Sequence, residues 1–401
     1  MNVIIKKSVA NGKAKAPPSK SMAHRALICG AFSKSSKIYN IAYSADISAT
    51  LDCLEKLGAF VEKNADHILI GGLSLDNIKE GTELFCNESG STLRFFVPIC
   101  MMSGKKITLK GSKRLFERPL AVYEKIAEEN GIYFEKGDDY VTVKGKLTGG
   151  EYTVPGDVSS QFITGMIYAL SLERSDSTIT VSGAFESASY VDLTLGALSS
   201  FGVEVSKSKN VFFIKGGQEY LSREYAVEGD CSNAAFLDAF NYLGGNVEVC
   251  GLSKETMQGD RVYLQMFEDI KNGKKQFDLS DCPDLAPIVF AIAATYGGAE
   301  FTGTARLKIK ESDRASVMAE ELAKFGINVI VNGNSVVVEK GVLKKPETEL
   351  CGHNDHRIVM SLACLCSLTG GTITDAQAVN KSYPNFFEEI ANLGIDYKMV
   401  N

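Results

Sequence analysis

A lysine, a serine and an arginine stand together near the N-terminus, within the stretch PPSKSMAHRALICGAF at residues 17–32. Lys20, Ser21 and Arg25 lie at the start of an apolar segment with the spacing of a helix. A helix N-terminus already carries a partial positive charge and unpaired N–H groups. Two further cations are unfavourable there unless an anion lies among them, so this stretch predicts a site for an anion.

Polar groups precede other apolar segments of the N-terminal half. NESGSTLR contains Gly90, whose missing side chain lets backbone N–H groups approach a ligand. GDVSSQF offers Ser159, Ser160 and Gln161 as donors to phosphate or sugar oxygens. GSKRLFERP places Arg118 in a loop, where arginines are usually solvated. N-capping alone explains any single helix start, but it does not require the Lys, Arg, Gln or His that accompanies four of the six starts.

The C-terminal half combines carboxylates with cations. DCPDLAP places Asp284 at the start of an apolar helix, where the helix dipole favours an acid even without a function. RLKIKESDR carries a run of charges that would ordinarily form a solvated face. Carboxylates beside lysines and arginines are nevertheless what acid–base chemistry on an anion requires at neutral pH. The candidates in this half are Asp284, Lys310, Glu311, Arg314, Arg357 and Lys381.

Composition excludes several classes of function. A formal net charge of −6 argues against nucleic acid as a partner. No Walker or GxSxG motif is present, and neither CxxC nor a Cys/His cluster has metal-ligand spacing. The ten scattered cysteines predict free thiols in a reducing compartment. Without an apolar run of about 18 residues or a signal-peptide core, we expect a cytoplasmic protein that needs no membrane, metal or cofactor.

Six amphipathic segments share one form, in which a helix is followed by a glycine and a short strand. The glycines suit the left-handed residue that ends a helix, and their spacing of about 50 to 75 residues fits a βαβαββ unit. They are Gly58, Gly131, Gly202, Gly273, Gly326 and Gly394.

A second set of six segments is apolar nearly all round and predicts helices buried at the centre of a domain. Three such helices in parallel would place their N-termini on one face, and two such faces would hold a multiply charged anion. The sequence thus predicts an α/β fold of two similar domains with three repeats each. We expect an N-terminal lobe at residues 14–227 and a C-terminal lobe at 228–401, joined by residues 1–13.

Nine short motifs occur in order along the whole chain: PSKSMAHR, NESGSTLR, ERP, GDVSSQF, SASY, SDCPDLAP, KIKESDR, DHR and KSYPNFF. In these the chain resembles the enolpyruvyl transferases, and within them the branch that acts on shikimate 3-phosphate. The resemblance implies an inverse α/β barrel fold with buried parallel helices. It also implies a monomeric enzyme that moves the enolpyruvyl group of phosphoenolpyruvate to the 5-hydroxyl of shikimate 3-phosphate and releases phosphate. Glyphosate mimics phosphoenolpyruvate in this family, so the intact Gly90 predicts sensitivity to it.

The resemblance also implies roles for individual residues. Asp284 would take the proton of the 5-hydroxyl, Glu311 would transfer a proton at the methylene carbon, and Lys20 would lie between the two substrates. Shikimate 3-phosphate would be bound by Lys20, Ser21, Arg25, Ser159, Ser160, Gln161, Ser187, Tyr190, Asp284 and Lys310. Phosphoenolpyruvate would be bound by Lys20, Gly90, Arg118, Gln161, Arg314, Arg357 and Lys381.

Two departures and two alternatives remain at this stage. Glu88 replaces an Asn that many members carry, and Arg306 stands where some place a substrate-binding Asn, so we assign no role to either. A related enzyme acts on UDP-N-acetylglucosamine with a loop cysteine, but the loop at 112–118 has none. An inactive anion-binding module of the same fold would be expected to lose Lys20, Asp284 or Glu311, and all three are present.

Overall fold

Two compact units make up the chain in the computed structural model, which describes residues 1–400. The central unit is the continuous segment Lys20–Glu228. The terminal unit combines Met1–Ser19 with the chain from Gly229 onward. No helix of the described residues is long and apolar enough to cross a membrane.

The elements of the central unit follow the repeats that the sequence predicts. In chain order they are α1 (Lys20–Phe32), β3 (Ser36–Tyr39), α2 (Ala45–Leu57), β4 (Phe60–Lys63), β5 (His67–Gly71), η1 (Leu75–Asn77), β6 (Thr82–Phe85), α3 (Gly90–Met101), β7 (Ile107–Lys110), α4 (Lys113–Glu117), α5 (Ala121–Glu129), β8 (Tyr133–Lys136), β9 (Tyr140–Lys144), β10 (Glu151–Pro155), α6 (Ser160–Leu170), β11 (Ser177–Ser182), α7 (Ala188–Ser200), β12 (Val205–Ser208), β13 (Val211–Ile214) and β14 (Glu224–Ala226).

The terminal unit has the same kinds of elements. They are β1 (Asn2–Ile5), β2 (Asn11–Lys15), α8 (Cys231–Tyr242), β15 (Asn246–Cys250), η2 (Gly259–Val262), α9 (Tyr263–Lys271), β16 (Gln276–Asp278), η3 (Pro283–Leu285), α10 (Ala286–Thr295), β17 (Ala299–Thr302), η4 (Ala305–Ile309), α11 (Arg314–Lys324), β18 (Val329–Asn332), β19 (Ser335–Val338), β20 (Leu350–Cys351), α12 (His356–Thr369), β21 (Gly371–Thr374), η5 (Ala376–Lys381), α13 (Phe386–Asn392) and β22 (Tyr397–Val400).

Five four-stranded sheets share one topology, with a parallel pair followed by two antiparallel pairings. Their strand orders are β14-β3-β5-β4, β6-β7-β9-β8 and β10-β11-β13-β12 in the central unit, and β16-β17-β19-β18 and β20-β21-β1-β22 in the terminal unit. The sixth sheet has only the parallel pair β15-β2. The fourth repeat lacks a hairpin because only residues 272–275 separate α9 from β16, which pairs in parallel with β17 just as β6 pairs with β7.

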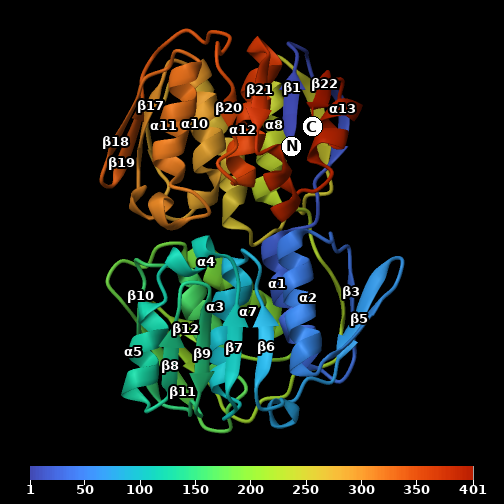
Figure 1. The fold of residues 1–401 in the computed structure, drawn as a ribbon, viewed down its shortest axis with the longest axis vertical. Coiled ribbons are helices and arrows are strands. Elements are labelled where there is room, and N and C mark those ends of the chain that lie inside the picture. Colours follow the sequence, from blue (N-terminus) through green and yellow to red (C-terminus); the bar gives the residue numbers. More distant parts are fainter. Residues whose placement is uncertain (401) are drawn as a thin grey trace. The chain divides into compact units, whose positions relative to one another are not determined.

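Six apolar helices form the cores, as their sequences predict. In α10, every residue from Ala286 to Ala294 is buried. The other five, α1, α3, α6, α8 and α12, are each buried along most of their length. The amphipathic helices pack against them, and Figure 1 shows α2 beside α1 in the central unit. The six glycines that follow the amphipathic helices all have φ between 64° and 110°, which confirms the predicted left-handed ends.

The chain passes between the units at two strands, and each of these strands stays in the unit that it leaves. β2 leads to α1 of the central unit but pairs with β15, and β14 leads to α8 of the terminal unit but pairs with β3. The expected lobe boundary at residue 14 therefore falls inside β2. Residues as far as Ser19 belong to the terminal unit, where the Pro17 carbonyl accepts a hydrogen bond from the Asp230 N–H (2.7 Å).

Candidate active site

The first residues of α3 and α6 lie close together in the central unit. Gln161, the second residue of α6, donates its amide nitrogen to the Ser91 hydroxyl (3.0 Å) and accepts from the Arg94 guanidinium (2.8 Å). Ser159 caps α6 by accepting from the Gln161 N–H (3.3 Å). Arg94 is buried, also contacts the Pro119 carbonyl (3.2 Å), and was missed by the sequence analysis although it is the last residue of the NESGSTLR motif. The two helix starts therefore form one hydrogen-bonded group.

Lys20 and Arg25 point to partners on different helices. The Lys20 ammonium forms an ion pair with Asp46 (2.7 Å), at the start of α2. Arg25 is buried, and its guanidinium donates to the Tyr190 carbonyl (2.7 Å) and the Thr194 hydroxyl (2.9 Å), both on α7. Burial lowers the pKa of Arg25. The start of α1 is thus fixed to α2 and α7 by its two cations.

Two more residues from the sequence analysis lie at the start of α7 and α6. Ser187 precedes α7 in a left-handed conformation with φ of 55°, and its side chain is buried. Ser160 is the first residue of α6 and is also buried. Ser21 contributes its backbone carbonyl to the Arg25 guanidinium (2.7 Å). The predicted residues of this half therefore gather at helix starts, as their spacing indicates.

Gly90 and Arg118 are in direct contact. A Cβ atom placed on Gly90 would lie 2.5 to 2.9 Å from the guanidinium atoms of Arg118. Arg118 is only 7% exposed, and among the described residues its Nε has no hydrogen-bond partner. A buried cation that lies against the first residue of a helix is suited to an anionic ligand, because the helix N–H groups and the charge act in the same direction.

Asp284 is the centre of a charged cluster in the terminal unit. Its carboxylate accepts from Arg314 (2.8 Å), Arg357 (3.1 Å) and Lys310 (3.2 Å). Burial alone would raise the pKa of Asp284, but the charges of Arg357, Lys310 and Arg314 hold it well below its usual value. The side chain does not cap α10, because the residue at the N-cap position is Leu285, which makes no side-chain bond.

Arg314 connects three carboxylates and is almost completely buried. Its guanidinium contacts Glu311 (2.7 Å), Asp284 (2.8 Å) and Asp355 (2.9 Å), and its side chain is 1% exposed. The charge run RLKIKESDR is therefore not a solvated face. Asp355 was quoted within a motif by the sequence analysis but was not assigned to the site. It also caps α12 by accepting from the Arg357 N–H (2.9 Å).

Two lysines complete the cluster. Burial lowers the pKa of Lys310 to about 8, although Asp284 opposes this shift. The Lys381 ammonium donates to the Asn354 carbonyl (2.5 Å), next to Asp355. Four cations thus lie around the carboxylates of this cluster, and they keep the pKa of Asp284 low. Such an arrangement can bind an anion. When the anion pairs with the cations, they stabilise the neighbouring carboxylate less, and that carboxylate can then accept a proton.

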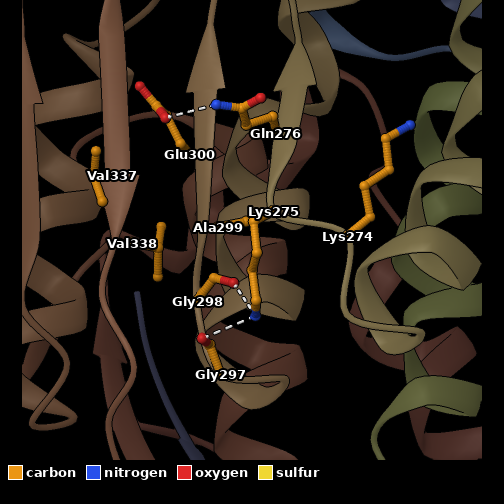
Figure 2. Close-up of a pocket in the computed structure, with 9 residues that line it drawn as sticks. All are labelled: Lys274, Lys275, Gln276, Gly297, Gly298, Ala299, Glu300, Val337 and Val338. Carbon is orange, nitrogen blue, oxygen red and sulfur yellow. Dashed lines mark hydrogen bonds between the residues drawn. The ribbon is translucent and has the colours of Figure 1, made fainter.

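A pocket elsewhere in the terminal unit contains none of the predicted residues (Figure 2). It has a volume of about 540 Å³ and is lined by residues of β16, β17 and β19 and of the segments that lead into β16 and β17. Lys275 points to the carbonyls of Gly297 (3.0 Å) and Gly298 (2.8 Å), just beyond the C-terminal end of α10. Asp284 precedes the other end of that helix, so the pocket is separate from the charged cluster.

Comparisons with known proteins agree with one another. Residues 5–390 match the family model described as EPSP synthase (3-phosphoshikimate 1-carboxyvinyltransferase). A 3-phosphoshikimate 1-carboxyvinyltransferase of Clostridium kluyveri is 39% identical over 98% of this chain and 97% of its own. One of Clostridium beijerinckii is 38% identical over 96% of this chain and 95% of its own.

Solved structures show the same fold. An EPSP synthase from Acinetobacter baumannii has a TM-score of 0.80 at 22% identity and covers 99% of this chain and all of its own (100%). The enolpyruvyl transferase NikO from Streptomyces tendae has a TM-score of 0.75 at 13% identity, over 99% of this chain and 98% of its own. These likenesses establish the two-domain α/β architecture that the sequence predicts.

Proposed function

The chain belongs to the EPSP synthase family, and we propose that the charged residues described above carry out that family's reaction. The enzyme transfers the enolpyruvyl group of phosphoenolpyruvate to the 5-hydroxyl of shikimate 3-phosphate, and phosphate leaves. The observation that carries the residue assignment is the Asp284 carboxylate held by Lys310, Arg314 and Arg357. The relatives named above do not favour the alternative acceptor, UDP-N-acetylglucosamine.

We propose that Asp284 acts as the base at the 5-hydroxyl. The hydroxyl oxygen adds to the substituted carbon of phosphoenolpyruvate and its proton passes to Asp284, while Glu311 gives a proton to the methylene carbon. Glu311 then takes a proton back from that carbon as the C–O bond to phosphate breaks. Without substrate, the pKa of Asp284 is low because of the neighbouring cations. An anion bound to Arg314 and Arg357 would partly neutralise them, raise the pKa of Asp284 and make it a stronger base.

The binding roles are proposals that rest on the family resemblance and on the contacts described above. Gly90 and Arg118 support a phosphoenolpyruvate site because the arginine is buried beside the helix start. The group for this substrate is Lys20, Gly90, Arg118, Gln161, Arg314, Arg357 and Lys381. The group for shikimate 3-phosphate is Lys20, Ser21, Arg25, Ser159, Ser160, Gln161, Ser187, Tyr190, Asp284 and Lys310.

The first experiment measures phosphate release from phosphoenolpyruvate with either shikimate 3-phosphate or UDP-N-acetylglucosamine. We expect release with shikimate 3-phosphate alone. In Asp284→Asn, kcat should fall by roughly 10²- to 10⁴-fold, the usual contribution of a general base. Asp281→Asn is the matched control, because Asp281 lies in the same loop and is more exposed. An Asp284→Asn variant with full kcat would remove the base from the mechanism.

We also propose that the protein acts as a monomer in the cytoplasm. All ten cysteines are free thiols, as is usual in a reducing compartment. Sedimentation of the active enzyme tests the monomer. Activity that sediments only as a dimer would contradict it.

A further inference from the structure

The turn Gly352–Asp355 has an unusual backbone. The Asp355 N–H donates to the Gly352 carbonyl (2.9 Å), and the two central residues are left-handed, with φ of 48° at His353 and 51° at Asn354. A turn with two such residues ordinarily contains glycine, because a side chain is strained in this conformation. Neither central residue here is glycine. His and Asn adopt this conformation more readily than most residues with a side chain, but at a cost, so contacts from outside the turn should help to hold it.

This turn holds three cations of the terminal unit. The Asn354 carbonyl accepts from Lys381, and the Asp355 carboxylate accepts from Arg314 Nε (2.9 Å). The same carboxylate caps α12 through the Arg357 N–H (2.9 Å). Arg314, Arg357 and Lys381 are the terminal-unit residues proposed above for phosphoenolpyruvate. A displacement of the turn would therefore displace all three of them.

A buried carboxylate on α11 holds the turn in place. Glu321 is completely buried and accepts from His353 Nε2 (2.8 Å) and from the Cys351 N–H (3.0 Å). Burial opposes its ionisation, but hydrogen bonds from His353, Lys324 and the Cys351 N–H lower the pKa of Glu321. An ionised carboxylate only accepts hydrogen bonds, so the His353 Nε2 carries a proton in this contact. Neither residue was identified by the sequence analysis.

Glu321 and Arg314 lie on the same side of α11, two helical turns apart. Arg314 donates a hydrogen bond to Asp355 at the end of the turn, and Glu321 accepts one from His353 in its middle. The helix therefore holds the turn at two points. Arg314 is itself a proposed ligand of the substrate, whereas Glu321 and His353 have no proposed contact with it and can serve to position the turn.

A metal ion is a less suitable explanation of the same residues. Glu320, Glu321 and His353 offer ligand atoms within 4.8 Å of one another. The Lys324 ammonium, however, already contacts both oxygens of Glu321 (2.8 and 3.0 Å). A divalent cation would have to displace this ammonium from a buried carboxylate. The geometry is that of a hydrogen-bonded anchor.

We propose that the hydrogen bond between His353 and Glu321 is a positioning contact, which holds the Gly352–Asp355 turn so that Arg314, Arg357 and Lys381 can bind phosphoenolpyruvate. This inference rests on the proposed function, because it assigns those three cations to that substrate. In this proposal His353 acts through the turn and not by contact with the substrate. Its loss should therefore change the binding of phosphoenolpyruvate more than that of shikimate 3-phosphate.

Three substitutions of His353 separate the anchor from backbone strain. His353→Ala removes the donor, and His353→Gly removes the donor but relieves the left-handed strain. His353→Gln restores an amide donor at about the same distance from the backbone. The matched control is His67→Ala, which removes a histidine that contacts a carboxylate, Asp66 (2.7 Å), in the central unit.

The readouts are kcat, both KM values and the melting temperature. We expect KM for phosphoenolpyruvate to rise ~10-fold in His353→Ala and His353→Gly, the loss expected when one positioning contact goes. In His353→Gln, KM for phosphoenolpyruvate should stay within about 3-fold of the wild type, because the amide keeps a donor to Glu321. In all three variants, KM for shikimate 3-phosphate should stay within about 2-fold, because the turn does not hold the residues proposed for that substrate. His353→Gly should keep a melting temperature near that of the wild type, so that a folding defect does not explain its KM.

Other outcomes would overturn the inference. If His353→Gly has the wild-type KM for phosphoenolpyruvate, the histidine only fills a strained position. If KM rises equally for both substrates, His353 supports the fold in general and does not position the residues for phosphoenolpyruvate. If Mn²⁺ or Zn²⁺ raises the melting temperature of the wild type but not of His353→Ala, the residues form a metal site instead. Arg357→Gln tests the underlying assignment separately: an unchanged KM for phosphoenolpyruvate there would refute the proposed substrate site itself.

Discussion

Replacing Gly90 by alanine should weaken phosphoenolpyruvate binding through Arg118. The added Cβ would lie 2.5 Å from one terminal nitrogen of the Arg118 guanidinium and 2.8 Å from its central carbon. Ordinary contacts of a Cβ begin at 3.4 Å, so the guanidinium must move by about 1 Å. Backbone strain plays no part, because φ of Gly90 is not positive. Alanine is also a better helix former at the start of α3.

The size of the effect follows from the charge of the contact. A hydrogen bond to a charged group contributes about 1.5–3 kcal/mol, which corresponds to roughly 10- to 150-fold in affinity. Arg118 moves but is not removed, so we expect the lower part of this range, an increase of about 10-fold in KM for phosphoenolpyruvate. The melting temperature should hardly change. Glyphosate, which mimics this substrate, should lose inhibition by a similar factor.

The assay is phosphate release at saturating shikimate 3-phosphate over a range of phosphoenolpyruvate concentrations. Gly333→Ala is the control, because a Cβ there meets nothing within 4 Å and its φ is not positive. A KM in Gly90→Ala within 2-fold of this control, on a folded protein, would refute the reasoning. It would mean either that Arg118 moves without consequence or that it does not bind the substrate.

Three further predictions concern Lys20, Lys310 and the absence of a metal requirement. Lys20→Ala should raise KM for both substrates, since the lysine is proposed to lie between them; a rise for phosphoenolpyruvate alone would show that it is not shared. With the pKa of Lys310 lowered to about 8, kcat/KM should fall above pH 8 in the wild type, and Lys310→Arg should move this limb to higher pH. The effect of Lys310 on stability should have the opposite sign. Between its folded pKa of about 8 and its unfolded value of 10.5, the unfolded chain binds more protons than the folded one. The contribution of Lys310 to the free energy of unfolding should therefore rise with pH over that range. A chelator should leave kcat unchanged, and a marked loss would contradict a metal-free reaction.

The sequence predicts the repeating elements because their signals are local. Apolar spacing and the glycines at positions such as 58 and 326 mark helices and their ends within a few residues. The fourth repeat shows the limit of this reasoning. Its helix and glycine resemble the others, but only residues 272–275 separate α9 from β16, so the chain has no room there for a hairpin. The strand expected after Gly273 is present as β16, but its parallel pairing with β17 leaves no local pattern.

The candidate residues show a similar division. Gly90 and Arg118 were both named from their motifs, and the structure brings them into contact. For Asp284 the sequence allowed a capping role, and only the approach of Arg314 and Arg357 distinguishes the two readings. Partners that orient other residues were not assigned to the site, although some lie within the quoted motifs, because their side chains become close only on folding. These are Arg94, Asp46, Asp355, Glu321 and His353.

The discontinuous course of the terminal unit, which takes residues from both ends of the chain, has a consequence for synthesis. The central unit is one continuous segment, complete once β14 has been made, and it can fold while the ribosome is still working. The terminal unit cannot, because β1 pairs with β21 and β22 and must wait for residues near 400. At about 5–20 residues per second, the remaining 170 or so residues take roughly 10 to 35 s. During that interval the nascent N-terminal strands are exposed without their partners, and β1 is the strand that a chaperone would have most time to bind.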